Sequence, residues 1–284
     1  MLAGVFSHFF RAMRWKMLIK PMGYTPSNRN ITMAVFIGFF ANLALPRLGE
    51  VSKCGALAKY EKIPMNKMIG TVITERGIDL ITFVGLFLIT VLYNFNKIGA
   101  YFQTKVTTPL SEEISALQNP HVLIYTGLAL LLITIIIIYY YRNRFSQKSI
   151  NIKINQLIKG LFEGIKSLSK IKNPFLFILY TSLIWIFYWL MTQVVFMSLA
   201  ETINLDYGVG LVALMFGSVG LIVVQGGIGI YPAIIAETLF LYHIPETTGY
   251  ALGWLLWSGQ TLLIIVLGTI SFGLLPVLNR KKSN

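Results

Sequence analysis

The residues of this chain most able to do chemistry are charges beside a sequence that breaks a helix. The segment Asn-Leu-Ala-Leu-Pro-Arg-Leu-Gly-Glu begins at Asn42 and ends at Glu50, and it contains Arg47. Its proline, Pro46, and its glycine, Gly49, both interrupt a helix. Opposite charges at such a break indicate a polar path, along which a charged ligand or a proton can be held. Asn42, Arg47 and Glu50 are therefore candidate functional residues.

A second charged group, Glu75, Arg76 and Asp79, lies in an apolar stretch further along the chain. On a helix Glu75 and Asp79 share a face, and Arg76 is three positions before Asp79, so these charges can pair internally. Together with Arg47 and Glu50 they predict one charge cluster. Purely structural roles, as interfacial residues or as a clamp between helices, are the alternative.

The elements that must position these residues are transmembrane helices. Of the 284 residues, 55% are hydrophobic and 12% are charged, with a mean hydropathy of +0.68. A soluble domain has about a quarter of its residues charged. Four stretches carry no charge, namely 122–141, 174–200, 207–236 and 247–279, and a span needs only about 20 such residues. The sequence predicts an all-α, polytopic integral membrane protein with one domain over residues 1–284.

The bilayer makes one further carboxylate a candidate. Glu237 is the single charged residue between Tyr207 and Tyr242. Ionisable groups inside a bilayer are costly and usually face a partner, a pathway or a cavity. A carboxylate there needs a cation, water or a proton, so we add Glu237 to the substrate-pathway residues.

The net charge of +13 lies beside the apolar stretches, which argues against nucleic acid as a partner. Basic residues gather in residues 11–29, 53–67, 142–172 and 280–282. The positive-inside bias places these four groups in the cytoplasm. Residues 94–121 and 201–206 carry no such basic excess and are predicted outside.

This orientation predicts two broken hairpins. The apolar run Ile31–Leu45 is short for a crossing, so we expect it to stop at Pro46–Gly49 and return through Val51–Tyr60. The second hairpin would run through Tyr207–Val224 and return through Ala233–Tyr242. Its break holds three glycines and a proline, which disfavour helix: Gly226, Gly227, Gly229 and Pro232. Two full crossings joined by a tight loop are the alternative for the second hairpin.

Each half of the chain then contains a span, a broken hairpin and another span, in opposite orientations. The halves are predicted at residues 1–96 and 121–284. Paired broken segments of this kind indicate an inverted-repeat transporter with a binding site near the middle of the membrane.

The sequence gives no pattern for an enzyme. The three histidines are scattered, and no metal-ligand spacing is present. The glycines near Gly227 lack the Lys-Ser/Thr of a phosphate loop, and no nucleophile with a base partner can be named. We therefore expect no catalytic residues, no metal and no cofactor.

The ordered motifs resemble a known family. Asn42 with Pro-Arg-Leu-Gly-Glu, then Glu75-Arg-Gly-Ile-Asp79, and later the glycines from Gly226, look like the transmembrane region of bacterial lysylphosphatidylglycerol synthases and their stand-alone flippase-like relatives. Arg-Ala-Met-Arg-Trp near the start fits the same pattern. The chain departs from the family at Gln225, where proline is common, and at Lys53, where arginine is common. We also expect the family's first helix to be absent.

The resemblance implies a lipid flippase-like transporter in a bacterial inner membrane, without the aminoacyltransferase domain. Arg47 and Arg76 would contact phosphate, while the acidic residues would contact a cationic part of the head group or carry protons. Expected partners are membrane lipids, with either a second copy of the chain or a separate lipid-modifying enzyme. The alternatives are a secondary transporter of a small solute or ion and a non-transporting membrane assembly partner.

The predicted topology can be tested by cysteine labelling in a Cys54→Ala background. Because of the basic bias, single cysteines should be cytoplasmic at Arg29, Lys62, Lys148 and Lys282 and external at Gln103 and Asn204. An impermeant maleimide applied from each side measures this. External labelling at position 62 would eliminate the first hairpin.

Overall fold

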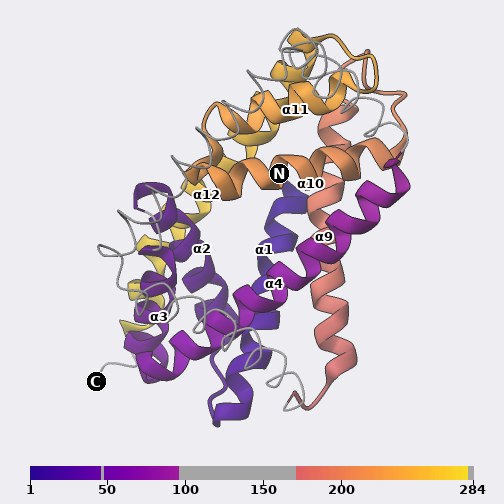
Figure 1. The fold of residues 1–284 in the computed structure, drawn as a ribbon. Coiled ribbons are helices and arrows are strands. Elements are labelled where there is room, and N and C mark those ends of the chain that lie inside the picture. Colours follow the sequence, from indigo (N-terminus) through magenta and orange to yellow (C-terminus); the bar gives the residue numbers. More distant parts are fainter. Residues whose placement is uncertain (46–47, 96–170, 281–284) are drawn as a thin grey trace, which may run out of the picture. The chain divides into compact units, whose positions relative to one another are not determined.

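The computed structural model describes residues 1–45, 48–95 and 171–280, in which the regular elements are all helices joined by short connections (Figure 1). The elements are α1 Leu2–Ile19, η1 Lys20–Met22, α2 Asn28–Ala44, α3 Leu48–Glu61, α4 Met65–Tyr93, α9 Pro174–Phe196, α10 Tyr207–Val223, η3 Gln225–Gly227, α11 Ile230–Phe240 and α12 Glu246–Leu278. The described residues up to Thr90 and from Ile171 onward belong to one compact unit. Within the described ranges there is no strand, so the predicted all-α class is confirmed.

Three of these helices are long and apolar enough to cross a membrane, namely residues Lys67–Tyr93 of α4, all of α9 and all of α12. Their lengths of 27, 23 and 33 residues exceed the roughly 20 that a span requires. The predicted apolar runs 174–200 and 247–279 therefore correspond to α9 and α12. The predicted run 122–141 lies outside the described residues. The chain is a multi-pass membrane protein.

Helix α1 packs against other helices of the unit, among them α2, α3, α4 and α9. Its buried face, with Trp15 and Ile19, joins Ile31 of α2, Leu57 of α3 and Met68 of α4 in one hydrophobic core. On another side its aromatic residues stack on α9, where Phe6 and Phe10 lie 5.4 and 5.7 Å from the ring of Phe187. Two arginines on α1 are thereby carried into the interior.

The first predicted break separates α2 from α3. Helix α2 ends at Ala44 and Leu45 is extended, while α3 starts at Leu48; Pro46 and Arg47 lie outside the described residues. The Asn42 side chain accepts a hydrogen bond of 2.8 Å from the backbone N–H of Gly49, which occupies one of the unpaired donors at the start of α3. Asn42 therefore ties the two helices together, and Gly49 belongs to the first turn of α3.

The second predicted break separates α10 from α11. Gly226, Gly227 and Gly229 all have positive φ, between 67° and 77°, a conformation that glycine adopts at little cost. Pro232, predicted as part of the break, instead lies in the first turn of α11. A proline is tolerated there because the first N–H groups of a helix have no partner within it. Helices α10 and α11 have 17 and 11 residues, which favours a hairpin over two crossings.

Helix α12 connects the two broken hairpins. Gly249 and Gly253 let it approach the backbone of α11 at Ala236 and Pro232, and Gly268 lies against Phe40 of α2. Its C-cap, Asn279, exchanges two amide hydrogen bonds of 3.0 Å with Asn30 at the start of α2. The yellow end of α12 accordingly lies beside α2 (Figure 1). One helix thus aligns both breaks.

The close approach of α2 and α3 gives a testable prediction. A Cβ on Gly49 would lie 2.2 Å from the carbonyl oxygen of Gly38, whereas a Cβ on Gly55 of the same helix would meet nothing within 4 Å. Gly49→Ala should therefore destabilise the protein by about 1–3 kcal/mol through overpacking. Gly55→Ala should be neutral or stabilising, by up to about 1 kcal/mol. Thermal unfolding in detergent measures both, and equal effects would contradict the close packing.

Candidate functional site

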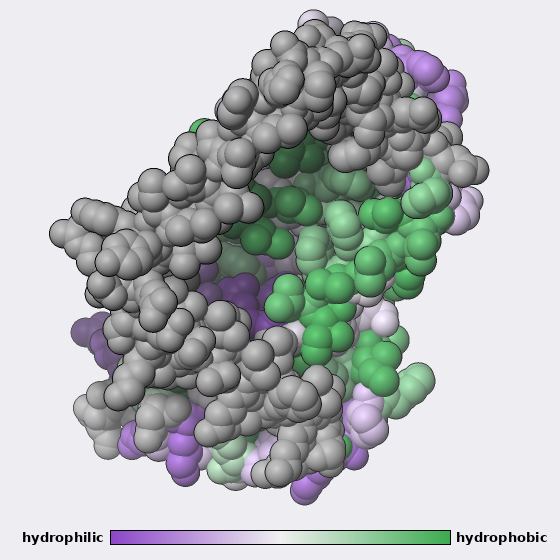
Figure 2. Space-filling model, viewed as in Figure 1, coloured by the Kyte–Doolittle hydropathy of each residue, from purple (hydrophilic) through white to green (hydrophobic). Residues whose placement is uncertain are grey.

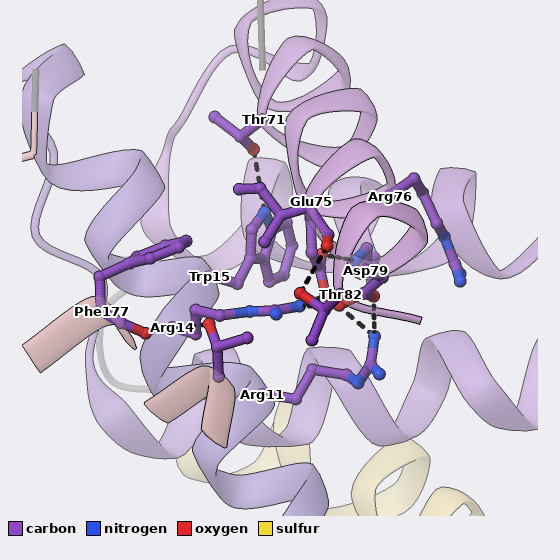
Figure 3. Close-up of polar contacts among 12 residues, drawn as sticks. Arg11, Arg14, Trp15, Thr71, Glu75, Arg76, Asp79, Thr82 and Phe177 are labelled. Carbon is purple, nitrogen blue, oxygen red and sulfur yellow. Dashed lines mark hydrogen bonds and ion pairs between the residues drawn. The ribbon is translucent and has the colours of Figure 1, made fainter. Parts of the chain in front are cut away.

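A buried ion network joins α1, α3 and α4 (Figure 3). The carboxylate of Asp79 accepts a hydrogen bond of 2.6 Å from Nη1 of Arg11 and another from Nη2 of Arg14. Glu75 accepts one of 2.6 Å from Nζ of Lys53 and lies 3.5 Å from Nη1 of Arg11. Each acid is therefore shared between cations from other helices.

Because the network is buried, each of its charges must be paired. All of its members except Asp79 are buried residues, and an ion removed from water costs several kcal/mol unless it is paired and hydrogen-bonded. Aromatic rings supply further contacts, since the Nζ of Lys53 lies 4.4 Å from the ring centre of Trp15. The indole N–H of Trp15 donates to Thr71 Oγ1 of α4 at 2.9 Å. The network holds three helices in one arrangement.

The sequence prediction placed these acids beside the wrong partners. Glu75 and Asp79 bond to Arg11, Arg14 and Lys53, which the sequence placed only among the basic groups of the cytoplasmic side, whereas the acids were expected to form one cluster with Arg76, Arg47 and Glu50. The spacing of these charged residues in the sequence could have indicated the pairing. Arg11 and Arg14 are three apart on one helix, and the two acids are four apart on another, so each pair presents one face.

Arg76 and Glu50 form a separate pair. The Arg76 side chain points away from Glu75 and Asp79 (Figure 3), and its Nη2 donates to Glu50 Oε1 at 2.8 Å. The side chains are 49% and 28% exposed, and exposed ion pairs contribute little stability. The other carboxylate oxygen of Glu50, Oε2, is buried and has no hydrogen-bond partner in the part of the chain that the structure describes. This pair is weak enough to exchange partners.

The Glu50–Arg76 pair lines a cavity of about 520 Å³ between the two helix breaks. Asn42 and Leu43 before the first break and Val223 and Gly226 at the second contribute to its wall. Figure 2 shows hydrophilic surface beside hydrophobic surface in a hollow on this face. A volume of this size is typical of small-molecule sites. The cavity is therefore polar on one side and apolar on the other, and we name it the head-group cavity for the role proposed for it below.

The ion network lies directly behind this cavity. A narrow crevice is lined by Lys53 and Glu75 of the network together with Glu50, Arg76 and Asn42. The structure thus brings together Asn42, Glu50, Glu75 and Arg76, as the sequence indicated. Asp79 lies deeper, bonded to α1.

Two other predicted site residues, Glu237 and Arg47, are not among the described residues that line the cavity. Glu237 is on the exposed side of α11, and the lining of the head-group cavity within the described residues does not include it. Arg47 lies outside the described residues. Among the glycines of the second break, Gly226 lines the cavity, and its carbonyl accepts a hydrogen bond of 2.6 Å from the indole N–H of Trp257.

Sequence reasoning missed the polar residues of α12. Trp257, Gln260 and Thr261 all line the head-group cavity. Their signal is a run of polar side chains within a long uncharged span, which an analysis based on charge passes over. In the part of the chain that the structure describes, no group of three or more His, Cys, Asp or Glu residues is placed to hold a metal ion.

Comparison with known proteins gives a family and one relative. The family profile described as Lysylphosphatidylglycerol synthase TM region matches residues 1–268. An 83-residue stretch is 35% identical to the UPF0104 membrane protein MJ1595 of Methanocaldococcus jannaschii and covers 28% of this chain. That stretch spans 25% of the relative's length. No solved structure matches the chain.

The two ion-pair environments predict unequal effects of mutation. Asp79→Asn leaves Arg11 and Arg14 to share one acid, so it should destabilise the protein by about 3–5 kcal/mol. Arg76→Gln removes an exposed pair and should cost less than about 1 kcal/mol. Thermal unfolding of both variants in the same detergent provides the comparison. Similar losses would contradict the distinction between a buried network and an exchangeable pair.

Proposed function

Since the chain belongs to the family of the lysylphosphatidylglycerol synthase TM region, we propose that it is a flippase-like transporter that moves the polar head group of a lipid between leaflets. The observation that carries this proposal is the head-group cavity, which lies between two helix breaks and is lined by Glu50 and Arg76. Broken helices at membrane depth are tolerated where they line a cavity. The breaks supply a polar site inside an otherwise apolar bundle.

Glu50 and Arg76 define the head group that fits best. The guanidinium of Arg76 matches a phosphate, for which arginine offers several fixed donors. Glu50 can accept from an ammonium group, and its Oε2 has an unused acceptor position. The two residues neutralise each other at 2.8 Å, so a ligand that separates them without leaving a bare charge must carry both signs. A zwitterionic phospholipid meets that condition.

The buried ion network supports this site from behind. Lys53 and Glu50 are three residues apart on α3, and Glu75 and Arg76 are adjacent on α4. The network fixes the two helices that present the exchangeable pair, so the pair can open without the helices moving apart. On this proposal Arg11, Arg14 and Lys53 position the site, and they do not contact the head group.

Transport by reconstituted protein tests the proposal. In vesicles, wild-type protein should move phosphatidylethanolamine to the outer leaflet, where an impermeant amine reagent detects it. Glu50→Gln and Arg76→Gln should each slow this by about tenfold or more, because a hydrogen bond to a charged group is worth about 1.5–3 kcal/mol. Lys59→Gln, an exposed change on α3 away from the cavity lining, is the matched control.

A charge exchange separates ligand contact from a clamp. The double variant Glu50→Arg with Arg76→Glu restores an ion pair but reverses its order along the cavity. If these residues contact the head group, folding should persist and transport should stay slow. Recovery of transport in the double variant would identify the pair as a structural clamp. Transport of a soluble zwitterion such as glycerophosphoethanolamine, without movement of the lipid, would instead indicate a solute transporter.

A further inference from the structure

A second cavity, of about 420 Å³, adjoins the head-group cavity. It is enclosed by the start of α1, by α9 and by α12, and its wall is almost entirely apolar, with Met191 and Val194 on α9 and Leu255 and Leu263 on α12. Gly4 closes one side of it, since a Cβ there would lie 3.0 Å from Sδ of Met191. The packed helices therefore leave a cavity suited to an apolar guest.

Helix α12 forms the wall between the two cavities. Leu255, Gly259 and Leu263 recur every fourth residue and line the second cavity, while Trp257, Thr261 and Ile264 line the head-group cavity. Residues four apart share a helix face, so the helix presents one stripe to each side. Leu256 and Gln260, themselves four apart, line both cavities. The two cavities therefore lie next to each other along one edge of α12.

His8 gives an independent sign of a ligand. It lines the second cavity and is only 1% exposed, yet neither ring nitrogen has a hydrogen-bond partner among the described residues. Its surroundings are aromatic, with Phe36, Phe39 and Tyr188 within 6.3 Å of its ring centre. Buried polar groups are normally hydrogen-bonded. An unpaired imidazole at the wall of an apolar cavity therefore points to a guest that brings an acceptor with it.

We propose that the second cavity binds one acyl chain of the transported phospholipid while its head group occupies the first cavity. This inference rests on the proposed function and specifies how the substrate is held. Gln260, at the shared edge, and His8 can donate to the ester oxygens that connect the chain to the glycerol, since those oxygens only accept. The protein would then select a membrane lipid over its soluble head group.

Gly259 allows this acyl-chain cavity to be filled without disturbing the fold. A Cβ on Gly259 would meet nothing within 4 Å, so a larger side chain extends into open space. Gly273, on the same helix, has the same freedom and is not among the residues lining either cavity. Gly259→Leu and Gly273→Leu are therefore a matched pair, and both replace glycine in a helix by a better helix former.

The experiment uses phosphatidylethanolamine with a diazirine in one acyl chain, incorporated in nanodiscs with the full chain. Irradiation should label peptides containing Met191 and Leu263, and Gly259→Leu should reduce that labelling relative to Gly273→Leu. In the vesicle assay, Gly259→Leu should also slow lipid transport at least fivefold relative to Gly273→Leu. Labelling equal to that of peptides containing the exposed residue Ile178 would show ordinary bilayer contact only and overturn the inference.

The two proposals fail in different ways. If wild-type protein moves no lipid in vesicles, the proposed function is wrong whatever the labelling pattern. If it moves lipid and Gly259→Leu moves it as fast as Gly273→Leu, the function stands and the acyl-chain cavity is overturned. Thermal unfolding of both variants confirms that the folded proteins are being compared.

Discussion

Glu75 and Asp79 are held by three cations from two other helices, and the arrangement of the first half depends on that pairing. None of these charges can be left alone in the interior, because an unpaired buried ion costs several kcal/mol. The three helices must therefore come together with Arg11, Arg14 and Lys53 in register with the acids. Helix α3 is thereby fixed against α4, since Lys53 of α3 bonds to Glu75, and Asn42 ties α2 to α3 through the N–H of Gly49.

The same two helices carry an exchangeable pair on the adjoining face. On α4 the neighbours Glu75 and Arg76 differ by about 100° around the axis, a consequence of 3.6 residues per turn. Glu75 is thereby directed inward to Lys53, and Arg76 outward to Glu50 and the cavity. The buried ion network therefore holds the helices in place, while the weak, half-exposed Glu50–Arg76 pair is the part that faces the cavity. This division would allow a ligand to replace the pair while the helices keep their positions.

Local sequence patterns predicted the helices and their breaks. They did not predict which charged residues pair, because these partners come from helices far apart in the sequence. Lack of charge over about 20 residues identifies spans such as α9 and α12, and glycine clusters locate the break after Val223. The positive-inside bias, however, counts basic residues without regard to burial, so it placed Arg11, Arg14 and Lys53 on the cytoplasmic side without naming a partner for them. Their partners lie 22 to 68 residues away, where spacing alone gives no register. Gln260 was missed because it carries no charge.

Helix α12 shows how one uncharged span can serve two environments. Its glycines at 249, 253 and 268 bring it close to both hairpins, which places its middle turns between the polar and apolar cavities. There, side chains four residues apart form two separate stripes. One stripe, with Trp257 and Thr261, faces the head-group cavity, and the other, with Leu255 and Leu263, faces the second cavity. An amphiphile is the ligand that matches both faces at once, because its polar and apolar parts must be bound side by side. Gln260, at the edge the two cavities share, lies where those parts would join.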